Sequence, residues 1–219
     1  MSAPGSGILA RGPWHPDQVR VRWLEQAYEP PADLDRQADT AVDALRERGS
    51  PCHDGLSTRL ASFAEVDGGL ALELQPSRWA LRLVDTDASD SLTALCVVRT
   101  DDGRWLAGRR AGWVSTWAGR WALGAGGAVD LGESPAETLP RELHEEWQLE
   151  AHSLSIEALV RIPNGLAMVV GLATVADTSE PVADDEHDEW AWWDPDPDRW
   201  PEHADDRVRT MGRLLAAAR

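Results

Sequence analysis

Hydrophobic positions recur along the chain with different spacings, and the spacing indicates which segments form helices and which form strands. Apolar side chains in residues 33–48 lie three or four positions apart, which predicts an amphipathic helix that stops at the Gly-Ser-Pro sequence of residues 49–51. Apolar runs over residues 60–66 and 70–74 flank an Asp-Gly-Gly sequence, which is typical of a β-hairpin. The first dozen residues are rich in Gly, Ala, Ser and Pro, and we expect a loose tail there.

After residue 90 the pattern alternates between predicted strands and predicted helices. We expect strands over residues 92–99, 105–109, 153–162 and 166–175, a short strand ending at 190–193, and a closing helix over 207–219. Mixed strands with helices of this kind predict an α+β fold, arranged as an α/β/α sandwich. The short polar segment 85–91 marks the expected boundary between an accessory region, residues 1–89, and a second domain, residues 90–219.

Composition excludes several classes of protein. The chain has 38 acidic residues against 21 basic ones, a net charge of −17, and every basic residue is Arg. Such an excess of acid argues against binding of duplex nucleic acid, which requires neutralisation of phosphates. The longest apolar run, residues 166–176, is too short to span a bilayer. An anionic ligand would therefore need a metal ion or a local group of arginines.

Two cysteines are too few for a disulfide framework. Cys96 lies in an apolar run and is expected to be a small buried residue with a reduced thiol, and Cys52 is also expected to be reduced. The N-terminus lacks the charged start and apolar stretch of a signal peptide, so we expect a cytoplasmic protein.

Residues 126–149 form the segment that carries chemistry. Ser134 followed by Glu137, with Pro135 between them, predicts a helix that begins at Pro135 with a capping box. Within this helix Glu142, Glu145 and Glu146 stand at i, i+3 and i+4, so three carboxylates share one face. Like charges this close together repel each other in the absence of a cation. A hard divalent cation such as Mg²⁺ prefers carboxylate oxygens as ligands and would offset that repulsion.

The preceding loop strengthens this interpretation. It contains glycines that allow close approach of a ligand to the backbone, and Glu133 adds a fourth carboxylate just before the helix. The order Gly127, Glu133, Arg141-Glu142-Leu143, Glu145-Glu146 resembles the Nudix box. The resemblance covers the box closely and extends, in strand order, over roughly residues 90–219.

The resemblance implies a Nudix α/β/α sandwich with a mixed sheet. It also implies particular roles for single residues. Glu142, Glu145 and Glu146 would hold Mg²⁺ or Mn²⁺, together with the carbonyl oxygen of Gly127, while Glu133 would support the metal site. Arg141 would orient the glutamates by ion pairing. A later acid often acts as ligand or base in the family, and Glu189 fits that place best, with Glu186 second. Glu142, Glu145 and Glu189 all remain candidates for the general base.

Two residues depart from the family pattern. Gln148 stands where the family has Gly, at a position that commonly ends the helix in a left-handed conformation, so we expect an altered helix end. Pro140 lies inside the helix, removes a hydrogen bond to the Ala136 carbonyl and is expected to bend the first turns.

Arginine and tryptophan alternate before the glycine loop. The arginines suit phosphate and the tryptophans suit a base or sugar ring, although for any single residue a core Trp or a solvated Arg is the favoured interpretation. We take as substrate-binding candidates Arg104, Arg109, Arg110, Arg120 and Trp117. His187 lies among acidic residues and is expected at the surface. Residues 1–89 weakly resemble extensions of UDP-sugar-cleaving Nudix proteins, and a role in dimerisation or as a lid fits them equally well.

The sequence thus predicts an Mg²⁺-dependent Nudix hydrolase that cleaves a diphosphate linkage in a nucleoside diphosphate derivative. Its substrate would be a nucleotide sugar, a dinucleotide or a nucleoside triphosphate, with no duplex nucleic acid and no membrane as partner. The alternative is a Nudix-fold module that binds a nucleotide without cleaving it. A prenyl-diphosphate isomerase would use the same box but needs a reactive Cys, and RNA cap removal is disfavoured by the net charge. A homodimer, the commonest assembly, stays open.

Overall fold

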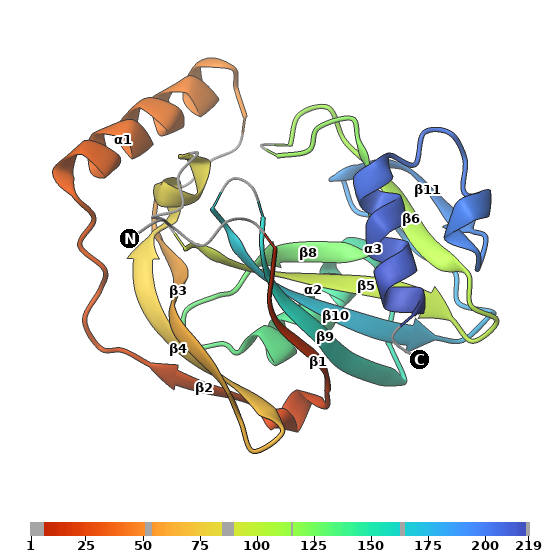
Figure 1. Cartoon of the computed structure of the whole chain (residues 1–219). Coiled ribbons are helices and arrows are strands. Elements are labelled where there is room, and N and C mark those ends of the chain that lie inside the picture. Colours follow the sequence, from red (N-terminus) through yellow and green to blue (C-terminus); the bar gives the residue numbers. More distant parts are fainter. Residues whose placement is uncertain (1–6, 51–53, 85–89, 115, 163–164, 218–219) are drawn as a thin grey trace.

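A mixed eight-stranded sheet forms the centre of the described part of the chain (Figure 1). The computed structural model describes residues 7–50, 54–84, 90–114, 116–162 and 165–217. The main strands are, in spatial order, β1 (Gly7–Trp14), β9 (Ser153–Arg161), β10 (Ala167–Val175), β5 (Leu92–Thr100), β6 (Trp105–Arg110) and β11 (His187–Trp193). β7 (Trp121–Leu123) pairs with β6, and β8 (Ala125–Ala128) pairs with β5. Only the β10–β5 pair is parallel among the pairs formed in this sheet by described residues.

Helices cover both faces of this sheet. In Figure 1 α3 (Asp206–Ala216) lies in front of the sheet and α2 (Pro135–Trp147) behind it. Side chains of β5 pack on both faces of the sheet, because successive side chains of a strand point to opposite faces. Cys96 packs in the cluster that contains the apolar face of α2, whereas Val97 packs in the cluster that contains α3. The predicted α/β/α sandwich is confirmed.

The N-terminal region adds a smaller sheet and a helix. The sheet has the order β2 (Val19–Trp23), β4 (Gly69–Arg78), β3 (Leu56–Val66), and β3 and β4 form the predicted hairpin. Helix α1 (Ala32–Glu47) buries its apolar stripe against the 3₁₀ turn η2 (Trp79–Leu83), as the spacing of its leucines and alanines predicts. The remaining short turns are η1 (Pro16–Gln18) and η3 (Pro197–Arg199). None of the described helices is long and apolar enough to cross a membrane.

The expectation of a loose tail is wrong for residues 7–12. They belong to β1, which pairs with β9 from Gly7 opposite Arg161 to Trp14 opposite Ile156. Ala10 and Trp14 are buried in the main core. Composition misled here because the strand is stabilised by a partner far away in the sequence, which local residue types do not report.

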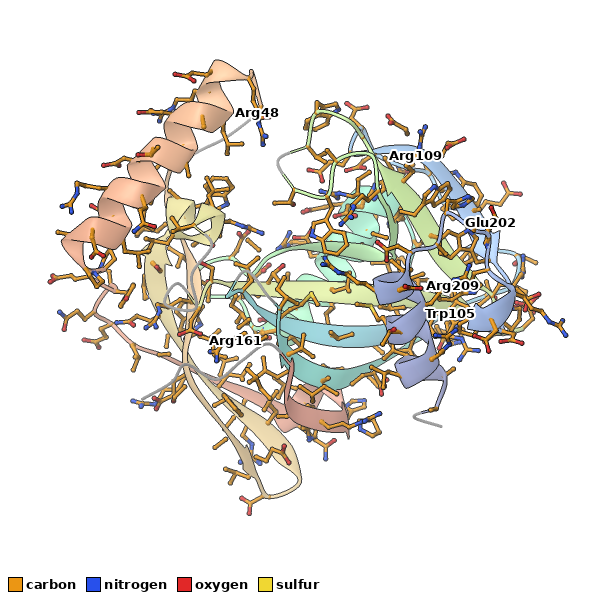
Figure 2. All side chains as sticks on the ribbon, turned by 45° about the horizontal axis from the view of Figure 1, so that its top comes forward. Arg48, Trp105, Arg109, Arg161, Glu202 and Arg209 are labelled. Atoms are coloured by element: carbon orange, nitrogen blue, oxygen red, sulfur yellow. The ribbon has the colours of Figure 1, made fainter. Side chains whose placement is uncertain are left out.

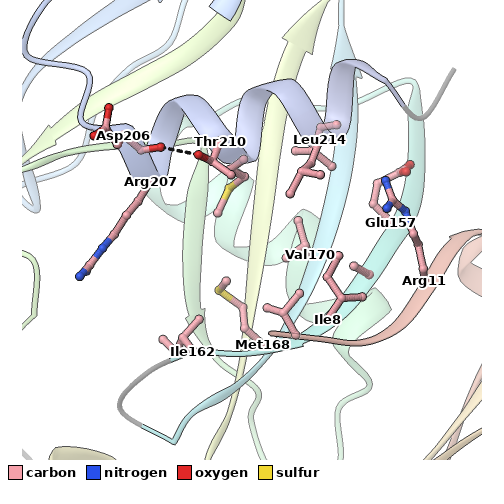
Figure 3. A pocket seen from close by; sticks show the side chains of 14 residues that line it. Ile8, Arg11, Glu157, Ile162, Met168, Val170, Asp206, Arg207, Thr210 and Leu214 are labelled. Atoms are coloured by element: carbon pink, nitrogen blue, oxygen red, sulfur yellow. Dashed lines mark hydrogen bonds between the residues drawn. The ribbon is translucent and has the colours of Figure 1, made fainter. Parts of the chain in front are cut away.

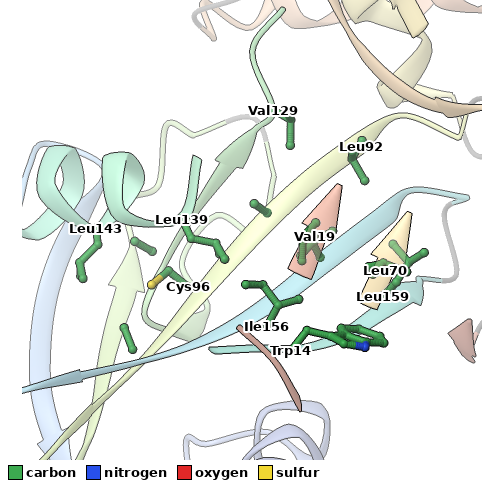
Figure 4. Close-up of a cluster of buried hydrophobic side chains, with 14 of the residues drawn as sticks. Trp14, Val19, Leu70, Leu92, Cys96, Val129, Leu139, Leu143, Ile156 and Leu159 are labelled. Carbon is green, nitrogen blue, oxygen red and sulfur yellow. The ribbon is translucent and has the colours of Figure 1, made fainter. Parts of the chain in front are cut away.

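The two predicted regions share one hydrophobic core. The cluster beneath α2 continues into the small sheet, and Figure 4 shows members from both sides, among them Trp14, Leu70 and Leu139. Asp90 joins the regions through its side chain, which pairs with Arg59 of β3 and with Arg161 of β9. Figure 2 places Arg161 at this junction. Of the predicted boundary, residues 85–89 lie outside the described part.

Candidate functional site

Helix α2 begins as its sequence predicts. Ser134 is the N-cap residue, and its Oγ accepts a hydrogen bond from the Glu137 backbone N–H at 3.3 Å, while Glu137 Oε2 accepts from the Ser134 N–H at 2.8 Å. Pro135 occupies the first turn, where its missing N–H costs nothing. The helix continues through Pro140 to Trp147. The box is therefore presented on a helix with a well-defined start.

The end of α2 differs from the expectation of an altered terminus. Gln148 itself adopts the left-handed conformation, with φ 52° and ψ 31°, and its N–H donates to the His144 carbonyl. The correction has a simple reason: the backbone position demands the left-handed conformation, and Gln accepts it at a cost of about 1–2 kcal/mol. Leu139, Leu143 and Trp147 are buried against the sheet as predicted.

Arg141 connects the carboxylates of the box. Its Nη1 donates to Glu142 Oε1 at 2.8 Å and to Glu145 Oε2 at 3.0 Å, and its Nε donates to Glu133 Oε1 at 2.8 Å. Burial works to raise the pKa of Glu133, but hydrogen bonds from Arg141 and Thr138 outweigh it and the pKa is lowered. Glu133 thus stays ionised and fixes Arg141, which in turn fixes Glu142 and Glu145.

The two buried carboxylates of α2 lie against the glycine loop. A Cβ on Gly127 would lie 2.3 Å from Glu142 Oε1, so a side chain at this position would displace the Glu142 carboxylate. The Gly126 N–H donates to Glu146 Oε1 at 3.2 Å, whereas Glu146 Oε2 is buried without a hydrogen-bond partner. Burial raises the pKa of Glu142, and burial raises that of Glu146 to about 8. Of these two carboxylates, only that of Glu146 has a buried oxygen without a hydrogen-bond partner, whereas Glu142 is held by Arg141.

His187 is buried, contrary to the expectation of a surface residue. The centroid of its ring lies 4.4 Å from that of Trp147. Its Nδ1 lies 3.1 Å from Asp184 Oδ1, and its Nε2 lies 3.8 Å from Glu146 Oε2. Burial lowers its pKa. Sequence reasoning missed it because the β6–β11 register shifts between His187 and Glu189, and such a bulge changes the face to which a side chain points.

The donor set suits a hard divalent cation. Glu146 Oε2 has a free acceptor site, and Glu142 lies beside the same glycine loop. The Gly127 carbonyl accepts a hydrogen bond from Thr93 Oγ1, and Glu145 is exposed beside Arg141. Among the residues that the structure describes, no three His, Cys, Asp or Glu side chains already converge as a metal cluster. Binding of a cation would therefore draw the glutamates away from Arg141.

The later acids pair with arginines of β6. Glu189 Oε2 lies 2.9 Å from Arg109 Nε, and Glu186 Oε2 lies 2.9 Å from Arg110 Nη1. The charges of Arg110 and Glu186 both act on the pKa of Glu146, which puts this second pair within electrostatic range of the box. Glu186, the second choice for the later acid, therefore acts electrostatically on a glutamate of the box.

The remaining substrate candidates are spread over the sheet. Arg104 pairs with Asp102 beyond the C-terminal end of β5. The glycine loop lies near the other end of β5, where Thr93 is opposite Ala128. The structure therefore separates Arg104 from the box. Arg120 lies over the exposed ring of Trp117, 5.5 Å from its centroid. Among the interleaved tryptophans Trp105 is fully buried and belongs to the core.

A cavity of about 420 Å³ lies elsewhere, between α3 and the face formed by β1, β9 and β10 (Figure 3). Its walls are mainly aliphatic, including Ile8, Val170 and Leu214. None of the box residues lines it. We therefore locate the candidate site at α2 and the glycine loop, not at this cavity.

Comparisons with known proteins agree with the box. The NUDIX domain family model matches residues 90–208. Over 111 residues the chain is 34% identical to an isopentenyl-diphosphate Delta-isomerase from Leifsonia xyli subsp. xyli, covering 46% of this chain and 60% of that protein. It thus spans less than two thirds of this relative. The match leaves residues 1–89 outside, so the UDP-sugar subgroup suggested by that region gains no support.

Two solved structures are similar to parts of the chain at low sequence identity. A MutT NUDIX hydrolase from Burkholderia pseudomallei is 23% identical, with 57% of this chain and 97% of that chain covered and a TM-score of 0.46. A putative nudix hydrolase family member from Chromobacterium violaceum is 24% identical, with 58% and 77% covered and a TM-score of 0.44. The family match spans more than half of the chain, and the protein therefore belongs to the Nudix family.

Proposed function

We propose that this protein is an Mg²⁺-dependent hydrolase that cleaves the diphosphate linkage of a nucleoside diphosphate derivative. The observation that supports it is the complete set of box carboxylates, with Glu142 and Glu145 held by Arg141 and Glu146 keeping one unpaired buried oxygen. Glu142, Glu145 and Glu146 would hold the metal with the Gly127 carbonyl, and Glu133 would keep Arg141 in place. A bound divalent cation supplies charge neutralisation and polarises the attacked phosphorus.

The chain's own residues would then activate water. A carboxylate of Glu142, Glu145 or Glu189 accepts a proton from water, whose oxygen forms a bond to one phosphorus of the diphosphate. The bond from that phosphorus to the bridging oxygen breaks in line with the attack. The products are a monophosphate and a second phosphorylated fragment. Arg109 and Arg110 would bind the phosphates, and Trp117 with Arg120 would contact the ring or sugar.

Two other activities make different demands on the site. A binding module without catalysis has no evident use for the whole set of glutamates. The similarity to the Leifsonia protein suggests a second activity, isomerisation of a prenyl diphosphate. That activity needs a reactive thiol. Cys96 is fully buried, and burial raises its pKa to about 12, so it is an unreactive thiol. Cys52 lies outside the described residues.

The test is an incubation of the protein with Mg²⁺ and a panel of nucleotide sugars, dinucleoside polyphosphates, nucleoside triphosphates and isopentenyl diphosphate. Products are identified by mass, with EDTA as the metal-free control. Hydrolysis splits the substrate into two phosphorylated products, whereas isomerisation leaves the mass unchanged. No turnover of any member, or turnover insensitive to EDTA, would rule out the proposed activity.

Glu145→Gln is expected to lower the turnover rate about 100-fold or more relative to the wild type. The reason is that a carboxylate that binds metal or accepts the proton is replaced by a neutral amide. Glu150→Gln is the matched control, since Glu150 is an exposed residue just beyond α2. Circular dichroism checks that both variants stay folded. A Glu145→Gln protein with the wild-type rate would show that the box is not the catalytic centre.

A further inference from the structure

Two cavities lie side by side on the α3 face of the large sheet, away from helix α2 and the box. The first is the cavity of about 420 Å³ described above, and the second has a volume of about 280 Å³. Glu157 and Leu215 line both, so the cavities adjoin at these two residues. None of the box carboxylates lines either cavity. This face of the sheet therefore holds a space that the proposed hydrolase reaction does not use.

The first cavity has the walls of a site for an apolar chain. Its lining includes aliphatic side chains from β1, β9, β10 and α3, among them Ile8, Val160, Met168, Val170 and Leu214. Ile8 is 48% exposed and Leu214 is 43% exposed, so two of these large apolar side chains also face solvent. The volume falls within the roughly 300–1,000 Å³ of small-molecule pockets. An apolar ligand would cover these side chains and gain the free energy of their burial.

The second cavity is lined by hydroxyl groups. Ser153 of β9 is opposite Thr174 of β10, and Ser155 is opposite Leu172. Leu172 packs in the cluster that contains α3, and side chains two residues apart on a strand share a face. The hydroxyls of Ser153, Ser155 and Thr174 therefore point to the α3 side, where all three residues line the cavity. Polar oxygens thus adjoin the aliphatic space.

Glu157 lies between the two cavities because of an irregularity in β9. Val170 of β10 is opposite Ala158 and Gly171 is opposite Ile156, so Glu157 has no residue opposite it in β10. Ile156 packs in the cluster beneath α2, whereas Glu157 and Ala158 both line the cavity on the α3 side. The extra residue of a β-bulge changes the face to which its side chain points. The bulge therefore turns a carboxylate toward the cavities.

The Glu157 carboxylate is buried but not ion-paired. The residue is 8% exposed, its Oε1 accepts a hydrogen bond from Ser155 Oγ, and it forms no ion pair within the described part of the chain. A buried carboxylate is costly unless a cation or several hydrogen bonds compensate its charge. A cation bound between the cavities would supply that compensation.

The other charged residues of the first cavity are exposed, namely Arg11, Asp206 and Arg207. Figure 3 shows Arg11 near Glu157, but no ion pair joins these two described residues, and Arg207 lies at the opposite end of the cavity. Water and salt screen exposed charges far more than buried ones. The buried carboxylate of Glu157, and not the exposed arginines, therefore determines which charge a ligand should carry.

We propose that the two cavities bind a small aliphatic primary amine, with its chain in the first cavity and its ammonium group beside Glu157. An ammonium group has three N–H donors, which the Glu157 carboxylate and the hydroxyls of Ser155 and Thr174 can accept. The charges of ammonium and carboxylate compensate each other, and the chain covers the aliphatic walls. This site goes beyond the proposed hydrolase function and does not depend on it.

The test uses the full-length protein in EDTA, without nucleotide, and calorimetric titration with three probes of equal chain length: n-octylamine, octanoate and 1-octanol. We expect octylamine to bind about 10-fold or more tightly than octanoate. Glu157→Gln should weaken octylamine about 10-fold and leave octanol unchanged, because only the ammonium group needs the charge. Glu150→Gln, which changes an exposed glutamate just beyond α2, is the matched control and should bind octylamine as the wild type does.

A second pair of variants tests the aliphatic walls. Leu214→Ser should weaken octylamine and octanol alike, whereas Leu56→Ser, which changes an exposed leucine of β3 outside both cavities, should weaken neither.

Three results would overturn the proposal: no binding of octylamine, wild-type octylamine affinity in Glu157→Gln, or tighter binding of octanoate that is lost in Arg11→Gln. If Glu157→Gln does not fold, equal affinities of the wild type for octylamine and octanoate overturn it instead. A protein that binds octylamine through Glu157 but hydrolyses no diphosphate would keep this site and refute the hydrolase function.

Discussion

The carboxylate of Glu146 shows how burial changes the chemistry of a single side chain. One oxygen accepts from the Gly126 N–H and the other has no hydrogen-bond partner, with the His187 ring 3.8 Å away. Burial raises its pKa from 4.5 to about 8, so folding favours the protonated form between these two values. The contribution to stability is fully present below pH 4.5 and is lost as the pH rises through 8.

Glu146→Gln should remove this dependence, because the amide carries no titrating proton. In EDTA the wild type is expected to lose at least about 1 kcal/mol of unfolding free energy relative to Glu146→Gln between pH 5 and pH 8.5. Urea denaturation at a series of pH values measures the difference, with Glu150→Gln as the control. Mg²⁺ should narrow the gap at pH 8, because a bound cation favours the ionised carboxylate. Parallel curves for the two proteins would contradict the burial argument.

At the scale of single elements, helix α2 illustrates what the sequence predicts well. The capping box, the apolar stripe and the row of glutamates are all local patterns, and each lies where its spacing indicates. Local patterns also locate α1, the β3–β4 hairpin and the separate strands β5 and β10. These elements were predictable because neighbouring residues determine them.

The elements that were not predicted depend on distant partners. β1 forms because β9 is available, and His187 is buried because the bulge in β11 turns it toward Trp147. The box residues themselves were named from the sequence, but their roles stay predictions.

The left-handed residue at the end of α2 gives a prediction for this element. Gln148→Gly should raise the unfolding free energy by about 1 kcal/mol, because glycine adopts φ 52° without a steric penalty from Cβ. Gln148→Ala should give no gain, since alanine keeps the Cβ. Urea denaturation compares both with the wild type. Equal stability of the Gly and Ala variants would mean that the side chain of Gln148, not its backbone, determines the helix end.

On the scale of the whole molecule, the N-terminal region and the Nudix segment form one packing unit. They share a core and are joined by the ion pairs of Asp90 with Arg59 and Arg161. A Trp from β1 fills this core although it precedes the matched family segment by many residues. We therefore expect the two regions to unfold together.

Trp14→Ala tests this expectation. Removal of a side chain that is 5% exposed should cost about 3–5 kcal/mol and shift the whole transition rather than a part of it. Far-ultraviolet circular dichroism and tryptophan fluorescence should give coincident urea curves. Trp190→Ala is the control, because that ring is 40% exposed and its loss should cost less than about 1 kcal/mol. Two separated transitions would indicate independent domains.

The pairing of β1 with β9 also sets an order of events during synthesis. Residue 7 can meet its partner, residue 161, only after more than half of the Nudix segment has left the ribosome. Until then Trp14 and Ala10 are without the neighbours that cover them. A nascent chain arrested after β8 would therefore expose β1 to chaperones, because β9, the strand that pairs with it, follows β8 in the chain.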